Sequence, residues 1–191
     1  MANTAKHNRD EVIQKATWLF WEKGFHATSM RDLQDRVDLR PGSIYAAFGS
    51  KEGLFKEALK FYAAQNYRLL KNFQAEASPL NALKQFVTCI VLSEDEETPN
   101  EMCMLVKSIS ELTEENLELL EQAKDLLQSM ESIFTDMLIQ AQEQGEMDKS
   151  KDPQRLARLL QMQLIGLRAY QRANPNKAQV SEMIEDMFKA F

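Results

Sequence analysis

Glycine, proline, cysteine and histidine are all scarce in this sequence. Its 191 residues include six glycines, five prolines, two cysteines and two histidines, whereas leucine, alanine, glutamine, glutamate, lysine and methionine abound. Glycine and proline are the poorest helix formers, and the abundant residues are among the best. The composition therefore predicts an all-α chain. Aromatic and aliphatic side chains are numerous enough to build a packed core, which excludes global disorder.

The chain also lacks long hydrophobic runs and a disulfide framework. The longest apolar run, residues 86–92 even counting Thr88, is far too short to span a bilayer. The polar N-terminus has no apolar segment of the kind found in a signal peptide. Cys89 and Cys103 are too few for a set of disulfides, and free thiols are typical of a reducing compartment. We expect a cytoplasmic protein without a membrane partner, associated with the nucleoid through DNA.

No motif for catalysis or metal binding is present. His7 and His26 form no metal-ligand set with the cysteines. The segment 42–51 has a glycine and a lysine, but they are not adjacent as in a phosphate-binding loop. No nucleophile elbow occurs, and the acidic run 94–97 is typical of a solvated loop. We therefore expect no enzyme, no cofactor and no bound metal.

The charge distribution does not by itself indicate nucleic acid. The net charge is -6, which is unusual for a DNA-binding protein. Counted along the sequence, residues 1–60 carry 10 basic and 8 acidic side chains, and the remainder carries 13 and 21. The acidity thus lies in the C-terminal two thirds. A nearly neutral N-terminal part leaves no strong electrostatic footprint, so any DNA-binding function must be inferred from motifs.

Helix boundaries in the N-terminal part are clearly marked. Residues 9–24 have the apolar spacing of a helix that ends at Gly24. Ser29 precedes a short helix, and Asp32, three residues later, completes a capping box. A tight turn follows at Asp38 and Leu39. The sequence therefore predicts one longer and one short helix before this turn.

A further short helix and a long one follow the turn. Pro41 suits the first turn of a helix because its missing N–H costs nothing there. Gly49 ends this short helix, and Ser50 caps a helix that runs to about residue 77.

The C-terminal part repeats one device for starting helices. Ser78-Pro79, Thr98-Pro99 and Asp152-Pro153 each place a capping side chain before a proline at the first helical position. Residues 114–144 form a long amphipathic pattern that ends at Gly145. Residues 153–173 are apolar around most of the circumference, which predicts burial on several sides. No strand pattern is present.

Residues 29–48 have the organisation of a helix-turn-helix. The second helix of such a pair lies in the major groove, where its N-terminal residues meet base edges. Gly42 allows close backbone approach, Ser43 is a small donor, and Tyr45 offers a phenol to a phosphate. Free N–H groups at helix N-termini also attract phosphate, here beside Ser29 and Lys51. The alternative is an ordinary helical hairpin within a core.

The segment Arg40–Phe55, RPGSIYAAFGSKEGLF, resembles the DNA-binding domain of the TetR family. The resemblance covers about residues 9–60. It implies about nine helices, a DNA-binding domain at 7–60 with its helix-turn-helix at 29–48, and a ligand-sensing and dimerisation domain at 61–191. It also implies a homodimer on double-stranded operator DNA. The candidate DNA-binding residues are Ser29, Arg40, Pro41, Gly42, Ser43, Tyr45, Ala46 and Lys51.

Two departures from the family pattern affect the turn and the second helix. Asp38 stands where the family usually has glycine. Aspartate tolerates the left-handed region better than most residues, so we expect the turn to form. Arg40 and Pro41 replace a common Ser-Lys pair, and Arg40 can reach a phosphate or a guanine. Operator sequence is therefore not transferable from better-known relatives.

An effector pocket is expected between the C-terminal helices, where bundle sites usually lie. Arg168 would pair there with an anionic ligand, or instead with an acidic neighbour. Cys103 begins the helix after Pro99, and a helix N-terminus lowers a thiol pKa; it is a candidate redox sensor or a small buried hydrophobe. Each pocket candidate has plain core packing as its alternative. The candidates are Phe86, Cys89, Cys103, Met130, Phe134, Met137, Met162 and Arg168.

The last two helices have more apolar residues than one subunit's core requires. In the TetR family two such helices from each subunit form a four-helix bundle. The expected interface residues are Leu160, Leu164, Leu167, Ile184, Met187 and Phe188.

The sequence predicts a DNA-binding transcriptional regulator. We expect a repressor that a small-molecule inducer releases from its operator. The inducer would be electrophilic or oxidising if Cys103 is the sensor. A dimeric helical interaction protein without operator binding is the alternative. The sequence does not identify the effector, the operator sequence or the regulated genes.

Overall fold

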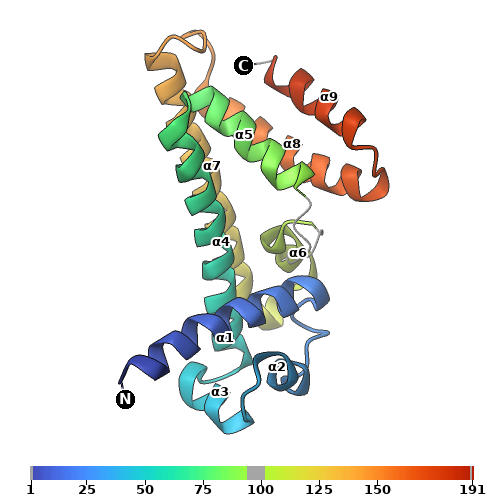
Figure 1. Cartoon of the computed structure of the whole chain (residues 1–191). Coiled ribbons are helices and arrows are strands. Elements are labelled where there is room, and N and C mark those ends of the chain that lie inside the picture. The colour runs from blue at the N-terminus through green and yellow to red at the C-terminus, as the bar shows by residue number, and fades with distance from the viewer. Residues whose placement is uncertain (1, 94–101, 190) are drawn as a thin grey trace. The chain divides into compact units, whose positions relative to one another are not determined.

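A computed structural model describes residues 2–93, 102–189 and 191, with side chains from residue 9 onward. Within these residues the chain forms nine α-helices and one short 3-10 helix, and no strand (Figure 1). The prediction of an all-α chain is confirmed. The elements are α1 (Ala2–Lys23), α2 (Met30–Val37), α3 (Pro41–Phe48), α4 (Lys51–Glu76), α5 (Pro79–Leu92), α6 (Met104–Glu111), η1 (Glu114–Asn116), α7 (Leu117–Glu143), α8 (Pro153–Ala173) and α9 (Lys177–Phe188).

Glycine ends three of these helices, as the sequence indicates. Gly24, Gly49 and Gly145 follow the ends of α1, α3 and α7 with φ values of 88°, 77° and 78°. A side chain is strained in this left-handed region, whereas glycine adopts it freely. The helix predicted over 153–173 coincides with α8, and the amphipathic pattern over 114–144 corresponds to η1 and α7.

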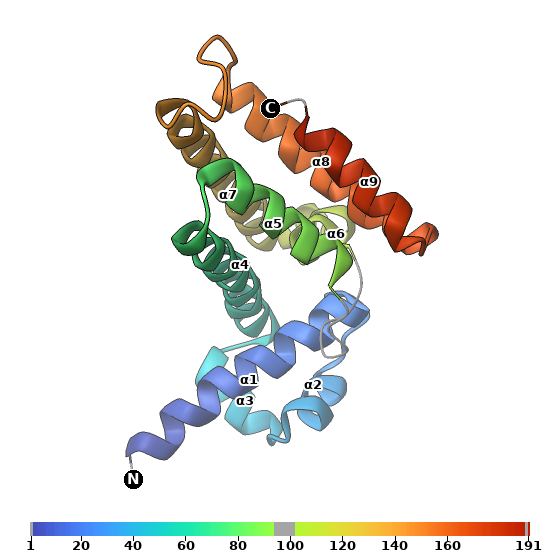
Figure 2. The ribbon, with the colours of Figure 1, turned by 45° about the horizontal axis from the view of Figure 1, so that its top comes forward.

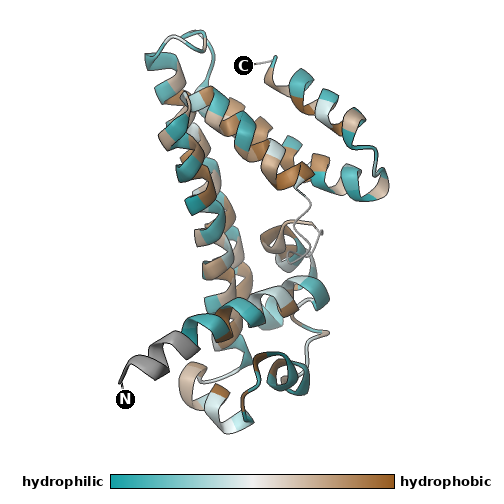
Figure 3. Ribbon diagram, in the orientation of Figure 1, coloured by the Kyte–Doolittle hydropathy of each residue, from teal (hydrophilic) through white to brown (hydrophobic). Residues whose placement is uncertain are grey.

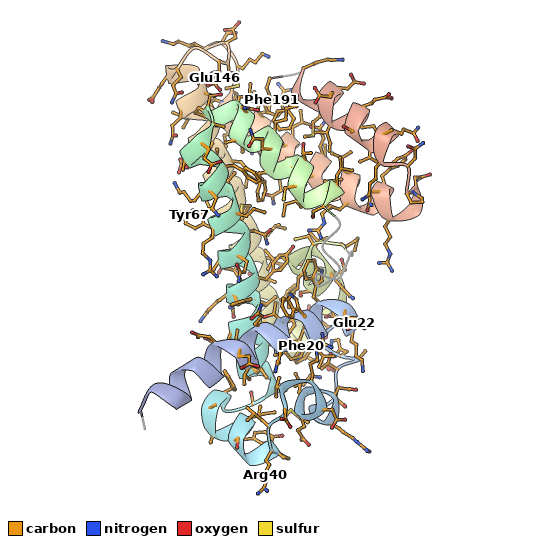
Figure 4. All side chains as sticks on the ribbon, in the orientation of Figure 1. Phe20, Glu22, Arg40, Tyr67, Glu146 and Phe191 are labelled. Atoms are coloured by element: carbon orange, nitrogen blue, oxygen red, sulfur yellow. The ribbon has the colours of Figure 1, made fainter. Side chains whose placement is uncertain are left out.

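Helix capping agrees with the sequence at one C-terminal site and differs at another. Asp152 caps α8, because its carboxylate accepts from the N–H groups of Gln154 and Arg155. The expected Ser78 cap is wrong: Ser78 occupies the N-cap position of α5, but its side chain makes no capping hydrogen bond. Instead Glu146, between α7 and α8, accepts from the Leu80 N–H at 2.9 Å (Figure 4). The predicted cap at Thr98-Pro99 and the acidic run 94–97 lie outside the described residues.

The chain divides into two compact units. Of the described residues, the first comprises 2–64 and 104–126, and the second comprises 65–93, 102–103, 127–189 and 191. The boundary predicted at residue 60 separates a DNA-binding domain from a ligand-sensing domain, and this functional division stays a prediction. The first unit extends beyond it, because α6 and the beginning of α7 pack with the N-terminal helices.

An aromatic cluster forms the core of the first unit. The Phe20 and Phe55 rings meet edge-on with centroids 4.8 Å apart, and Phe25 lies 4.9 Å from Phe55. Leu33 of α2 and Ile44 of α3 are fully buried in the same unit. Burying each such side chain stabilises the fold by about 1.5–3 kcal/mol. This core fixes the short helices α2 and α3 to α1 and α4.

The second unit has its own core, built from α5, the C-terminal parts of α4 and α7, and α8 and α9. Helices α5, α8 and α9 lie side by side in two views (Figures 1 and 2). Polar and apolar residues alternate around α4 and α7, as expected of amphipathic helices (Figure 3). No helix in the described part of the chain is long and apolar enough to cross a membrane.

One arc of α8 is not buried within one chain. Met162 is 63% exposed, and Leu159 and Ile165 are half-exposed. The helix directs Ala157, Leu160, Leu167 and Gln171 inward, and the opposite arc is left to solvent.

Candidate nucleic-acid interface

The first helix of the predicted helix-turn-helix begins with a capping box, as predicted. Ser29 Oγ accepts from the Asp32 N–H at 3.1 Å, and the Asp32 carboxylate accepts from the Ser29 N–H at 2.8 Å. Lys23 at the end of α1 donates to the same carboxylate at 2.7 Å. The lysine ammonium and the Ser29 donors hold the pKa of Asp32 well below its usual range. The start of α2 is thereby tied to the end of α1.

The turn between α2 and α3 forms with aspartate in place of glycine. Asp38 ends α2 with φ 53° and ψ 45°, which is the left-handed helical region. Aspartate enters this region more readily than most residues. The expectation that this turn survives is confirmed.

Helix α3 presents most of its surface to solvent. Ile44 is its one buried side chain, at 0% exposure. Pro41 occupies the first turn, as predicted, and Arg40 precedes it, projecting away from the ribbon (Figure 4). The expected DNA-contact residues in this stretch are all exposed: Arg40, Pro41, Gly42, Ser43, Tyr45 and Ala46. A helix that is anchored by one buried side chain and carries mostly small residues on its exposed face can enter the major groove of DNA.

The junction between α3 and α4 depends on a glycine that the sequence reasoning missed. Ser50 caps α4 by accepting from the Gly53 N–H at 3.1 Å. A Cβ atom on Gly53 would overlap the backbone carbonyl oxygen of Phe48, the last residue of α3. A glycine in the first turns of a long helix is unfavourable for helix formation, and this cost was the available signal. Gly53 allows α4 to start close against the end of α3.

Lys51 has an environment that the sequence did not predict. Its ammonium lies 4.3 Å from the centre of the Phe25 ring, in a cation–π contact. Burial lowers the Lys51 pKa. The side chain is half-exposed, so it is both a packing element and a candidate phosphate contact. Ser29, the other expected contact outside α3, is exposed at the N-terminus of α2.

Helix α6, which belongs to the first unit, makes hydrogen bonds to the end of α1 and to the residue that follows Gly24. Lys107 Nζ donates to the backbone carbonyls of Trp21 and Glu22 at 2.8 and 2.7 Å. The Glu111 carboxylate accepts from the Phe25 N–H at 2.6 Å and fills the space where a Cβ on Gly24 would lie. We call these contacts of Lys107 and Glu111 the α6 clamp. It joins α6 to the segment that leads into α2.

The expected pocket residues separate into three groups in the structure. Phe86, Phe134 and Met137 are at most 2% exposed and lie in the core of the second unit, with Met130 packed against it. Cys89 on α5 and Arg168 on α8 are half-buried. Burial raises the pKa of the Cys89 thiol.

Met162 and Cys103 do not join these core residues. Met162 does not line the core of the second unit, because it lies on the solvent arc of α8. Cys103 is half-exposed and immediately precedes α6, which begins at Met104; the cysteine is therefore not within the helix. Met162 instead borders an open hollow of about 730 Å³, lined by Ser150, Lys151, Asp152, Arg155, Leu156, Arg158, Leu159 and Met162.

The expected interface residues lie mainly inside the protomer. Leu160, Leu167, Ile184 and Met187 are buried in the core of the second unit, and Leu164 and Phe188 pack against it. These side chains face α5 and each other because α8 and α9 must first cover their own chain's core. The apolar side chains left exposed on the two helices are different ones, above all Met162 and Met183.

This chain is similar to known DNA-binding regulators in sequence. Residues 12–58 match the family model described as bacterial regulatory proteins, tetR family. The chain is 28% identical over 164 residues, 84% of this chain and 77% of the other, to the HTH-type transcriptional repressor ComR of Escherichia coli K12. It is 45% identical over 53 residues to the repressor BdcR of the same strain, covering 28% of this chain and 27% of BdcR.

Solved structures agree with these sequence relatives. A cysteine-substituted form of the TetR family regulator CifR, in complex with a 26-base-pair operator DNA, superposes with a TM-score of 0.86 at 25% identity, covering 96% of each chain. A TetR family regulator from Cytophaga hutchinsonii superposes with a TM-score of 0.85 at 22% identity over 97% and 94% of the two chains. These relatives are regulators, in line with the expectation that the chain is not an enzyme. With α3 exposed around one buried anchor, the chain is similar to TetR family transcriptional regulators, in sequence over residues 12–58 and in fold over nearly its whole length.

Proposed function

We propose that this protein is a homodimeric repressor that binds operator DNA through α3 and is released when a small-molecule inducer moves α6. The observation that carries the proposal is the exposure of α3 around its single buried side chain, Ile44. When a helix of this kind lies in the major groove of DNA, its N-terminal residues contact the base edges. The named relatives ComR and BdcR are repressors, which favours repression as the output.

The proposed DNA contacts divide into base-reading and phosphate-binding groups. Arg40 and Ser43, at the N-terminal end of α3, would meet base edges, and Gly42 would leave room for the DNA backbone and bases to approach. Tyr45 would donate its phenol to a phosphate, and Ser29 and Lys51 mark helix N-termini that attract phosphate. Pro41 and Ala46 complete the contacting surface without polar groups of their own. Phosphate contacts position the helix, and the base contacts give the sequence preference.

The proposed dimer interface is the solvent arc of α8 together with the exposed side of α9. Met162, at 63% exposed, is central to this arc, with Leu159 on one side and Ile165 on the other. Gly166 and Ala169 on the same arc are small and allow a second helix to approach closely. Met183 is the exposed apolar residue of α9. An apolar arc of this kind is unfavourable in water and is covered when two copies pair.

Replacement of Met162 by glutamate is expected to convert the dimer into monomers. A charge at the centre of an apolar interface would be buried without a partner, which costs several kcal/mol. Because two half-sites must be bound together, operator affinity is expected to fall with the dimer. Sedimentation velocity would measure the mass, and Met162→Leu, which keeps the apolar surface, is the matched control. A Met162→Glu dimer as stable as the wild type would place the interface elsewhere.

The α6 clamp is the proposed route from effector to DNA. Two recognition helices of a dimer must lie about 34–36 Å apart to enter successive turns of the groove. Lys107 and Glu111 attach α6 to the end of α1 and to Phe25. A ligand that prefers another position of α6 would therefore displace α1 and α2. The loss of affinity equals the ligand's differential affinity for the two states.

Glu111→Ala is expected to uncouple effector from DNA. The variant loses the acceptor of the Phe25 N–H, so α6 can move without carrying the segment that leads into α2, although Lys107 still holds the end of α1. An inducer that weakens operator binding by about 5–150-fold in the wild type should weaken it by less than about threefold in the variant. Fluorescence anisotropy with and without inducer measures this ratio. Glu115→Ala, at an exposed position in η1, is the control and should respond like the wild type.

Two kinds of inducer fit the chain. An apolar molecule would have to enter the second unit among Phe86, Phe134, Met130 and Met137. An electrophile or oxidant would act on a thiol, and Cys103 is the better placed of the two cysteines. It is half-exposed next to the first residue of α6, whereas burial raises the pKa of Cys89 and disfavours its thiolate.

The experiment that tests the proposed function measures binding to the DNA upstream of the protein's own gene. Anisotropy against a shuffled duplex of equal length, in a salt series, should show specific binding with a slope that counts the phosphate contacts. Apolar compounds and thiol oxidants are then added, and any oxidant that releases the wild type should fail on Cys103→Ser. Equal weak binding to both duplexes would favour an interaction protein that does not read DNA.

A further inference from the structure

One arginine outside the matched family segment contacts three helices of the DNA-binding unit. Arg9 lies in α1, before the residues 12–58 that match the family model. Its Nη1 donates to the backbone carbonyl of Ala47 at 2.9 Å. Its guanidinium carbon lies 4.4 Å from the centre of the Phe48 ring, and Nη2 lies 3.7 Å from Glu57 Oε2 on α4. A single side chain thus joins α1, the C-terminal end of α3, and α4.

The contact with Ala47 meets a need that every helix end has. The last four carbonyls of a helix lack partners within the helix, and the C-terminal end carries a partial negative charge. In α3 the Tyr45 carbonyl accepts from the Gly49 N–H at 2.8 Å, and the Ala47 carbonyl accepts from Arg9. A cation at this point is therefore stabilising both as a donor and as a charge.

Helix α3 has few other attachments that could fix its orientation. It is eight residues long, and Ile44 is its one buried side chain. One buried anchor allows a short helix to pivot, whereas a second attachment at its end sets its direction. Arg9 supplies such an attachment through the carbonyl of Ala47 and the face of Phe48, in addition to the close junction with α4 at Gly53.

We propose that Arg9 is a positioning residue that fixes the direction of α3, so that its substitution reduces discrimination between operator and other DNA. The proposal rests on the proposed DNA-binding function. The guanidinium serves three partners with a planar set of five donors, and lysine cannot reproduce this arrangement although it keeps the charge. Arg9→Lys therefore separates positioning from a plain electrostatic contribution.

The test compares Arg9→Lys and Arg9→Gln with the wild type on two DNA probes. The first is a duplex that the wild-type chain selects from a randomised double-stranded library, and the second is its shuffled counterpart. Arg9→Lys is expected to bind the selected duplex about tenfold more weakly, with unchanged affinity for the shuffled duplex and an unchanged salt slope. Lys15→Gln, at an exposed ion pair with Glu11 on the same helix, is the control and should keep the wild-type ratio.

Hydrogen exchange of the DNA-free protein gives an independent readout. The amides of residues 43–49 should exchange faster in Arg9→Lys, while those of α4 and the thermal midpoint stay near wild type. Unchanged exchange in α3 would overturn the proposal whether or not the chain binds DNA. It would also be overturned if Arg9→Lys matched the wild type while Arg9→Gln lost affinity for both duplexes and about one unit of salt slope, the behaviour of a phosphate contact. Failure of the wild type to select any duplex would count against the proposed function alone.

Discussion

Gly53→Ala is expected to destabilise the protein and to weaken operator binding by about 100-fold. The added Cβ would overlap the carbonyl oxygen of Phe48, which is a backbone atom and cannot rotate away. Overpacking of this kind costs about 1–3 kcal/mol, and more where the backbone must shift. Relief requires the end of α3 to move away from α4. The base contacts made by α3 would then be misplaced, and each good bidentate contact is worth about 1–3 kcal/mol.

Two measurements check this prediction. Calorimetry should show a thermal midpoint lower by about 2–8 °C for a chain of this size, even though alanine is the better helix former by about 1 kcal/mol. Anisotropy should show the loss of operator affinity. Gly42→Ala is the matched control for folding, because a Cβ at Gly42 meets nothing within 4 Å. A Gly53→Ala protein with wild-type stability and affinity would mean that the junction of α3 and α4 is more adaptable than its geometry indicates.

Ala46→Glu is expected to abolish operator binding without affecting the fold. Ala46 is exposed on α3, so a longer side chain meets no packed neighbour there, and glutamate is a good helix former. In the proposed complex the new carboxylate would face the phosphates of DNA, and like charges placed together at an interface cost several kcal/mol. This corresponds to a loss of at least about 100-fold.

The control for the added charge is Gln128→Glu. Gln128 is exposed on α7, outside the proposed DNA-contact surface, and the substitution changes the net charge by the same amount. It should leave operator affinity within about twofold, the range of a screened distant charge. Thermal midpoint and sedimentation should be unchanged for both variants. Wild-type affinity in Ala46→Glu would remove α3 from the DNA interface.

The two glycines of the α3 region illustrate how much of the site local rules determine. Gly49 could be assigned from sequence, because a glycine after a short helix ends it in the left-handed region, where φ is 77°. Gly53 could not be explained in that way. Its role comes from the carbonyl of Phe48, which approaches only because α3 and α4 pack at a particular angle. The capping box at Ser29 and Asp32 is again local and was predicted correctly.

In the last two helices, the spacing of apolar residues does not indicate which side faces the core. Helix α8 has apolar residues around most of its circumference, so the sequence does not specify which side faces the chain's own core. Leu160 is buried and Met162 is 63% exposed, although both are apolar and only two residues apart. The rotation of α8 is set by packing against α5 and α9, and it moves the proposed interface from Leu160 to the arc around Met162.

The sequence by itself determined the helical class, most helix ends and the helix-turn-helix, because capping and termination involve hydrogen bonds between residues at most four positions apart. Only the tertiary structure decided the Glu146 cap of α5, the Arg9 contact with Ala47 and the α6 clamp. These join residues separated by 66, 38 and 86 positions along the chain. Such contacts depend on how helices are placed in space, and that placement follows from the packing of the whole core rather than from any local pattern.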